Sequence, residues 1–214
     1  YGNKEQKDKY LPKLSDGSMV PCFGLTGPHN GSDALGEIDT GMVFKDREGK
    51  LKIQVEINKR YITLAPVANL IGLAVNVIDP DKLLPPGVNP GVTVALLERG
   101  HPGLLQETYH NPLNVGFPNG TLKGHFAISE DQIIGGRDNI GRGWQMLMEC
   151  LAAGRGVSLP ATANGAAKVS TVASLIYAKH RKQFRIPLYK MQGVNTKLVD
   201  NLYHSTLISS SINF

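Results

Sequence analysis

Hydroxyl and amide groups gather in two short segments near the start of the chain. The first segment runs from Cys22 to Asp33 and reads Cys-Phe-Gly-Leu-Thr-Gly-Pro-His-Asn-Gly-Ser-Asp. An apolar run ends there in Thr26 and is followed by glycine, proline and asparagine, which is typical of a strand entering a tight loop. Such a loop presents hydroxyls and backbone N–H groups, and these suit a phosphate or the polar edge of a ring.

The second segment spans residues 58–64 and reads Asn-Lys-Arg-Tyr-Ile-Thr-Leu. By itself its Tyr-Ile-Thr tripeptide is an ordinary strand, because tyrosine and threonine both favour strands. Thr26 or Ser32 alone is likewise more often a cap or a turn former than a ligand. The distance between the two segments is what favours a shared site.

Composition narrows the classes of function. The net charge is +5, and the lysines and arginines are scattered, which favours small anionic ligands over nucleic acid. The six histidines include no pair with zinc-site spacing, and no serine or cysteine lies in a nucleophile motif. Cys22 and Cys150 are far apart, so a reduced thiol pair is expected rather than a disulfide.

Periodicity predicts three regions, at residues 1–17, 18–136 and 137–214. Residues 1–17 form a short helix, the end of an N-terminal helical domain, that stops at Asp16-Gly17. Residues 18–136 form a middle β domain with a hairpin between 42–45 and 51–57, buried strands within 67–78 and 92–98, and the spacing of a small antiparallel barrel or sandwich. Turn clusters fill 79–91 and 110–120.

Residues 137–214 start a C-terminal helical domain. A long helix is predicted to run to about Lys182 and to bend near Gly154–Pro160. Pro187 is expected to open the next helix. The chain starts without methionine and stops within an apolar periodic run, so we expect both ends to lie inside a longer protein.

These segments resemble the middle domain of the flavin-dependent acyl-CoA dehydrogenases. That family carries Thr-Glu-Pro-x-x-Gly-Ser-Asp after a hydrophobic stretch, and then Lys-x-Trp/Tyr-Ile-Thr. The sequence from Asn58–Pro66 through Gly154–Pro160 is similar to that of the large bacterial FadE-type members. The resemblance covers nearly all of the chain. It implies an α+β fold in which an antiparallel β-barrel or sandwich is flanked by helices, with the C-terminal bundle only partly present.

The resemblance implies FAD as the cofactor. The family's cofactor-binding positions fall on Phe23, Leu25, Thr26, Ser32, Tyr61, Thr63, Arg181, Phe184 and Gln192. The residues from Phe23 to Thr26 line the flavin ring and Ser32 reaches the phosphates. The Tyr61 ring covers a flavin face, and a hydrogen bond from Thr63 near N5 orients the ring.

Arg181 and Phe184 reach a neighbouring subunit's flavin in the family. A guanidinium offers paired N–H donors to a pyrophosphate, although Arg181 could also be a solvated helix-end cation. Two positions depart from the family pattern, since Gly27 replaces glutamate and Arg185 replaces glycine. The departures leave the charge of the first loop and the turn after Phe184 open.

The family's reaction removes two hydrogens from the α and β carbons of an acyl-CoA. The general base is expected downstream of residue 214, because the alternative family position is Gly154 and glycine cannot be a base. Arg155 is then a supporting residue, no catalytic residue lies within the chain, and these 214 residues alone are expected to be inactive. Alternatives are an acyl-CoA oxidase and a noncatalytic binding protein of the same fold.

The resemblance also implies partners and a location. The expected partners are an acyl-CoA substrate, an electron-transfer flavoprotein and further copies of the full-length protein. A cytoplasmic location is expected, with peripheral attachment to the inner membrane as the alternative.

Overall fold

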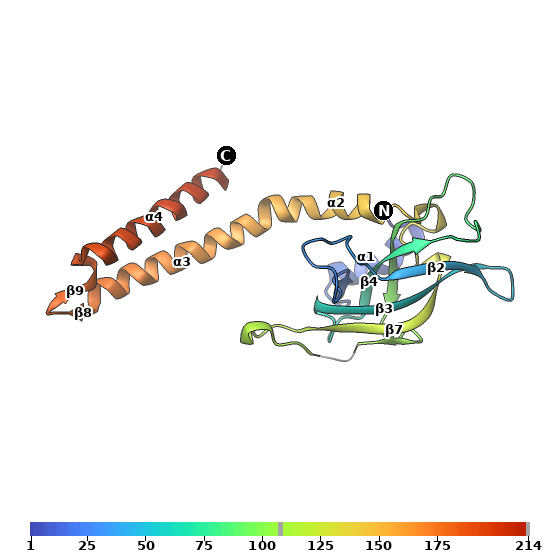
Figure 1. The fold of residues 1–214 in the computed structure, drawn as a ribbon, viewed down its shortest axis with the longest axis horizontal. Helices are drawn as coiled ribbons and strands as arrows, with labels where there is room; N and C mark the ends of the chain where they lie inside the picture. Colours follow the sequence, from blue (N-terminus) through green and yellow to red (C-terminus); the bar gives the residue numbers. More distant parts are fainter. Residues whose placement is uncertain (107–108, 213–214) are drawn as a thin grey trace. The chain divides into compact units, whose positions relative to one another are not determined.

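A computed structural model describes residues 1–106 and 109–212. The chain divides into two compact units, Tyr1–Met146 and Leu147–Phe214, and each is described by itself (Figure 1). The first unit holds a short helix and a large sheet, and the second unit consists mainly of helices.

The first unit begins with α1 (Lys4–Ser15), which confirms the predicted N-terminal helix. Asn3 and Gln6 form a reciprocal capping box, since each side chain accepts a hydrogen bond from the other residue's backbone N–H. The Gln6 amide is buried and also donates to the carbonyls of Asp131 and Ile133, at 2.9 and 2.8 Å. The helix is therefore tied to the segment after Ser129 by a side chain in its first turn.

Seven strands of the described residues form one sheet. They are β1 (Pro21–Gly24), β2 (Thr40–Lys45), β3 (Leu51–Thr63), β4 (Leu70–Ile78), β5 (Val92–Glu98), β6 (Leu104–Leu105) and β7 (Asn119–Ser129). The strand order is β1-β4-β2-β3-β7-β6, with β5 also paired to β4. Short 3₁₀ turns cover Pro112–Asn114, Glu130–Gln132 and Arg137–Asn139.

The predicted hairpin is confirmed. β2 and β3 pair antiparallel from Gly41 opposite Val55 to Lys45 opposite Leu51, and Gly49 takes a left-handed φ of 77° in the turn. The apolar runs predicted as buried strands form β4 and β5, which pair antiparallel with each other. The core of the unit collects apolar side chains of these strands, among them Ile53, Val55, Ile71, Leu73, Leu97, Leu122 and Ile128.

Two pairings differ from the predicted antiparallel barrel or sandwich, although the α+β class is confirmed. β1 and β2 both pair parallel with β4, and the sheet is open. β1 pairs with the first part of β4 (Leu70–Leu73), and β2 pairs with the last part of β4 (Asn76–Ile78). The chain between β1 and β2 therefore leaves the sheet as a loop, residues 25–39, and re-enters it along the same strand.

The second unit is built on two long helices. α2 (Gly143–Ala153) begins in the first unit and continues through a π-helical turn (Gly154–Ser158) into α3 (Leu159–His180). The turn confirms the predicted interruption, and Pro160 explains part of it because proline supplies no N–H to the helix. α4 (Gln192–Ile212) packs beside α3, where the Asn164 amide donates to the Ser209 hydroxyl at 3.0 Å (Figure 1).

Pro187 does not open the last helix, so that prediction is wrong. Pro187 lies in β9 (Ile186–Pro187), which pairs antiparallel with β8 (Lys182–Gln183) in a tight hairpin. A 3₁₀ turn (Leu188–Lys190) follows, and α4 starts only at Gln192. A hairpin forms here instead of the start of a helix, because Phe184 and Arg185 adopt left-handed φ angles of 49° and 66° and reverse the chain.

Candidate functional site

The two polar segments singled out in the sequence lie side by side in the first unit. The backbone N–H of Arg60, on β3, donates to the carbonyl of Thr26 at 3.0 Å. The Arg60 guanidinium also reaches the carbonyl of Pro28 at 3.4 Å. The loop after β1 is thus held against the end of β3, one residue before Tyr61.

A buried lysine on β3 contacts both ends of the same loop. The Lys59 side chain is fully buried, and its Nζ lies 2.9 Å from Asp39 Oδ2 and 3.0 Å from the carbonyl oxygen of Leu25. Burial lowers the pKa of Lys59 and the carboxylate of Asp39 opposes that shift. Leu25 begins the loop between β1 and β2 and Asp39 ends it, so one ammonium group contacts both ends of the loop.

Asn30 shapes the loop from within. Its side chain is buried, and Oδ1 accepts from the backbone N–H of Gly27 at 2.6 Å while Nδ2 donates to the carbonyl of Leu25 at 3.1 Å. A Cβ at position 27 would lie 2.9 Å from Asn30 Oδ1 and 3.1 Å from the Asn58 carbonyl. The glycine that replaces the family's glutamate therefore fits a loop packed too closely for a side chain.

The end of β3 is irregular. Its pairing with β7 shifts register between Lys59 and Ile62, and Tyr61 takes a left-handed φ of 58°. The backbone N–H of Tyr61 donates to Nδ1 of His110 at 3.3 Å, and the two rings lie 5.0 Å apart. The bulge leaves the Tyr61 ring half-exposed beside the loop after β1.

The aromatic ring of Phe23 and the hydroxyl of Thr63 are the other candidate groups of the first unit on these strands. Phe23 on β1 is partly exposed, and its ring lies against Gly72 of β4, where an added Cβ would meet it at 3.1 Å. Thr63 is exposed and pairs with Asn119 of β7. Asn119 Oδ1 is buried and has no hydrogen-bond partner among the described residues.

These groups fit the ring of a flavin. Its flat apolar faces match the exposed rings of Phe23 and Tyr61, and its polar edge requires hydrogen-bonding groups such as Thr26 and Thr63. Within residues 1–106 and 109–212, the backbone N–H of Thr26 makes no hydrogen bond and remains available. Ser32 is exposed on the loop between β1 and β2.

The remaining candidate residues belong to the second unit. Arg155 is exposed in the π-helical turn, Arg181 caps α3 through its backbone N–H, and Gln192 is the first residue of α4. Phe184 stands at the tip of the β8–β9 hairpin with 88% of its surface exposed. Arg181 therefore precedes the hairpin that carries Phe184 and Gln192 follows it, while Arg155 lies at the opposite end of α3.

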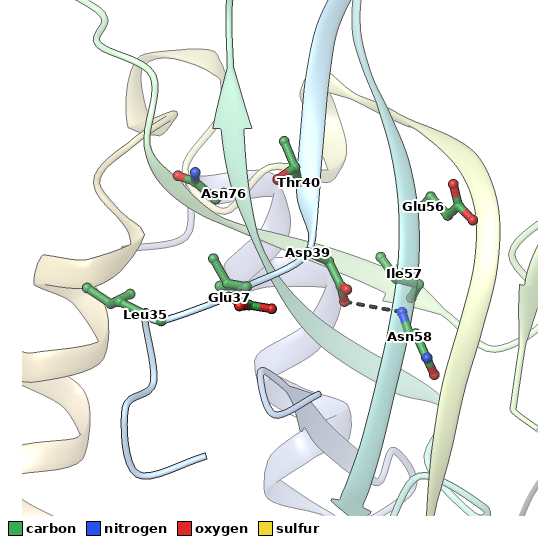
Figure 2. Close-up of a pocket in the computed structure, with 10 residues that line it drawn as sticks. Leu35, Glu37, Asp39, Thr40, Glu56, Ile57, Asn58 and Asn76 are labelled. Atoms are coloured by element: carbon green, nitrogen blue, oxygen red, sulfur yellow. Dashed lines mark hydrogen bonds between the residues drawn. The ribbon is translucent and has the colours of Figure 1, made fainter. Parts of the chain in front are cut away.

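A hollow of the first unit lies beside the loop rather than at the predicted ring site. It has a volume of about 720 Å³, and its lining includes Glu37, Asp39 and Glu56 (Figure 2). Figure 2 shows the Asp39 carboxylate directed at the backbone N–H of Asn58, to which it bonds at 3.2 Å. Carboxylates repel phosphate, so this hollow does not suit the cofactor's phosphates.

Both cysteines are free, and only Cys150 is exposed. Cys22 lies on β1, and burial raises the pKa of its thiol to about 11, which keeps the thiol neutral. No group of histidine, cysteine and carboxylate side chains in the described residues could hold a metal ion. None of the helices described here has the length and apolar character to cross a membrane.

Sequence reasoning missed four residues of this arrangement: Asn30, Asp39, Lys59 and His110. One signal for Lys59 was present, because Leu51, Ile53, Val55, Ile57 and Lys59 are alternate residues of β3 and all are buried. A lysine in that series had to find a partner in the core. Asp39 and His110 carry no comparable local signal, since each meets β3 only through the fold.

Known proteins are similar to this chain in sequence and in fold. Over 203 residues, 94% of the chain and 49% of the relative, the sequence is 30% identical to an acyl-CoA dehydrogenase of Bacillus subtilis. Over 97 residues, 45% of the chain and 57% of the relative, it is 43% identical to Protein HemX of Proteus mirabilis. An acyl-CoA dehydrogenase from Bacillus anthracis, solved in complex with FAD, superposes with a TM-score of 0.80 at 26% identity, over 99% of this chain and 34% of that one. No protein-family model matches the chain.

The chain belongs to the acyl-CoA dehydrogenase family. It spans about half the length of the curated relatives it matches. The family assignment agrees with the resemblance of the two motifs, which lie on the loop after β1 and at the end of β3.

Proposed function

We propose that this chain supplies part of the FAD site of an acyl-CoA dehydrogenase that converts fatty acyl-CoA to trans-2-enoyl-CoA in fatty acid β-oxidation. The observation that carries the proposal is the contact of Arg60 with Thr26, which joins the two motifs of the family in one place. The two segments joined by that contact carry two exposed aromatic rings and two threonines, groups that suit a flavin ring.

When bound, FAD would supply the acceptor for the hydride that leaves the β carbon. Thr63 would orient the ring through its hydroxyl, and the Tyr61 ring would exclude water from the hydride path. Thr26 holds the polar edge of the ring through its N–H and its hydroxyl, and Phe23 and Leu25 line the ring beside it. Ser32 contacts the phosphates from the outer part of the loop.

The second unit serves the cofactor of a neighbouring subunit in this proposal. Arg181 precedes the β8–β9 hairpin, Gln192 follows it, and the exposed Phe184 ring at its tip is accessible to a neighbouring subunit. The Arg181 fork suits a pyrophosphate, and Gln192 adds an amide donor and acceptor. Homo-oligomers of the full-length protein would bring these groups to the site.

The proton chemistry is assigned to a carboxylate outside these 214 residues. Gly154 stands where some relatives place the base, and its neighbour Arg155 supports the site without abstracting a proton. An acyl-CoA is the proposed substrate, a soluble electron-transfer flavoprotein is the proposed electron acceptor, and the proposed location is the cytoplasm.

The test uses the purified full-length protein. An absorbance spectrum gives the flavin bound per chain, and anaerobic mixing with acyl-CoAs of short, medium and long chains gives the rate of flavin reduction. We expect about one FAD per chain and reduction by at least one acyl-CoA. Absence of flavin, or a flavin that no acyl-CoA reduces, would contradict the proposal.

The acceptor is tested separately. Rapid reoxidation of the reduced enzyme by electron-transfer flavoprotein, with slow reoxidation in air, supports the dehydrogenase. Rapid reoxidation in air instead identifies an oxidase and overturns the proposed acceptor.

A further inference from the structure

We propose that Lys59 is a positioning residue that turns the Leu25–Thr26 peptide so that its N–H faces the cofactor. Lys59 does not reach the cofactor itself, since its side chain is fully buried, and it acts through the carbonyl of Leu25. The inference deepens the proposed function and rests on it, because the group that the peptide would meet is the carbonyl edge of a flavin ring.

The first step is the position of Lys59 in the core. It occupies the core-facing series of β3 that otherwise contains only Leu51, Ile53, Val55 and Ile57. Desolvation of an ammonium is unfavourable, and burial lowers the pKa of Lys59. A methionine would fill a similar volume at this position without that penalty, so packing alone does not call for a lysine.

The second step is the pair of acceptors that the ammonium contacts. Nζ lies 2.9 Å from Asp39 Oδ2 and 3.0 Å from the Leu25 carbonyl oxygen. Asp39 is itself fixed, because the same Oδ2 accepts from the backbone N–H of Asn58 at 3.2 Å. Lys59 therefore connects the first residue of the loop, Leu25, to its last residue, Asp39. Both loop residues are bonded to residues of β3.

The third step follows from peptide geometry. The described peptide bonds are all trans, and in a trans peptide the C=O and the N–H point in opposite directions. The Leu25 carbonyl is drawn toward the core by Lys59 and also accepts from Asn30 Nδ2 at 3.1 Å. The N–H of the same peptide belongs to Thr26, so it must point away from the core.

That N–H is free to bind. It makes no hydrogen bond to any described residue, and the carbonyl of Thr26 is already used by Arg60. Thr26 is partly exposed and also carries a hydroxyl, so this one residue has two donor groups. Two such donors match a ligand edge that carries carbonyl or imine acceptors, as the pyrimidine end of a flavin does.

The experiment compares two neutralised ion pairs in the full-length protein. The test variant carries Lys59→Met with Asp39→Asn, which removes both charges together and leaves no unpaired buried ion. The matched control carries Lys52→Met with Asp46→Asn, which removes an ion pair of 2.9 Å between the same strand and the β2–β3 connection, away from the loop. FAD affinity of the apoprotein, the visible spectrum of bound flavin and the thermal midpoint of the apoprotein are measured for each.

For the test variant we expect FAD affinity to fall about tenfold or more, as for the loss of one well-placed hydrogen bond to the ring. The visible bands of the remaining bound flavin should shift, because hydrogen bonding at the ring edge changes. The thermal midpoint of the apoprotein should stay close to the wild-type value, and the control should match wild type in all three measurements. A merely structural lysine would move the thermal midpoint and leave both flavin measurements unchanged.

If the test variant does not fold, Asp39→Asn alone decides, since it keeps an acceptor for Lys59 and removes only the charge. Its FAD affinity should fall by a smaller factor, and wild-type affinity would overturn the inference. Wild-type affinity and an unshifted spectrum in the folded double variant would also overturn it. A wild-type protein that binds no FAD would instead contradict the proposed function, so the two failures are distinguishable.

Discussion

Thr63 and Asn119 stand opposite one another in the β3–β7 ladder. Paired residues on antiparallel strands present their side chains to the same face of the sheet. Thr63 is exposed, whereas Asn119 Oδ1 is buried and unpartnered among the described residues. An unsatisfied buried acceptor is unfavourable, so its retention beside an exposed hydroxyl is consistent with a ligand-binding function at the end of β3.

Thr63→Val in the full-length protein should keep FAD bound and slow its reduction by acyl-CoA. Only one hydrogen bond of roughly 1 kcal/mol is lost, which corresponds to about a fivefold change. Flavin content and the anaerobic reduction rate are the measurements, with Thr40→Val, an exposed strand threonine outside the site, as the control. A reduction rate equal to that of wild type would remove Thr63 from the site.

Arg181→Ala should weaken the binding of FAD, whereas Thr63→Val should slow its reduction. If the guanidinium holds a pyrophosphate from a neighbouring subunit, its loss removes a charge-assisted contact and should weaken FAD retention by about tenfold or more. Bound flavin per chain after gel filtration and the oligomer size are measured. The neighbouring exposed residue gives the control, since Lys182→Ala removes a cation of equal charge. Full flavin content and normal oligomer size in Arg181→Ala would show that the arginine is only a surface cation.

The β8–β9 hairpin predicts that Arg185→Gly stabilises the second unit. Arg185 has a φ of 66°, which costs a residue with a side chain about 1–2 kcal/mol and costs glycine little. Denaturant unfolding should show a gain of roughly 0.5–1 kcal/mol after the entropy of glycine is counted. Lys190→Gly, in the 3₁₀ turn before α4, lacks this compensation and should destabilise. A loss of stability in Arg185→Gly would mean that the arginine makes a contact worth more than the backbone strain.

The two hairpins also show what sequence could predict. The β2–β3 hairpin follows from local chemistry, because Glu48-Gly49 separates two strands of alternating character. The parallel pairing of β1 with β4 is not local, since it joins segments separated by the whole loop and the β2–β3 hairpin. Alternation indicates that a strand exists, but it does not give the direction of the neighbour.

The candidate site divides in the same way. The motif residues Thr26 and Thr63 could be found from the sequence, because their spacing matches a family pattern. Lys59 could be placed on the core-facing side of β3, yet its role depends on Asp39, which meets it only when the loop folds back. Pro187 was misassigned because proline favours the first turn of a helix, whereas two left-handed residues before it form a hairpin.

Cys22 gives a prediction about chemical reactivity. Its thiol is buried with a pKa raised to about 11, while Cys150 is exposed. In a Cys150→Ser variant, a thiol reagent at pH 8 should label the native protein hardly at all and label it fully in denaturant, because the thiolate is the reactive form. Cys22→Ser should instead leave one thiol, Cys150, that reacts in the native protein.

The same thiol predicts a pH dependence of stability. The folded state raises the pKa of Cys22 from 9.0 to about 11, so the folded state holds its proton more tightly than the unfolded state. Its contribution to stability is fully present below pH 9 and is lost as the pH rises toward 11. Lys59 acts in the opposite sense, because its pKa is lowered from 10.5 and loss of its proton relieves a buried charge. Subtracting the unfolding free energy of Cys22→Ala from that of wild type at each pH isolates the thiol. That difference should fall across this range, and a flat difference would show that the thiol is accessible to solvent.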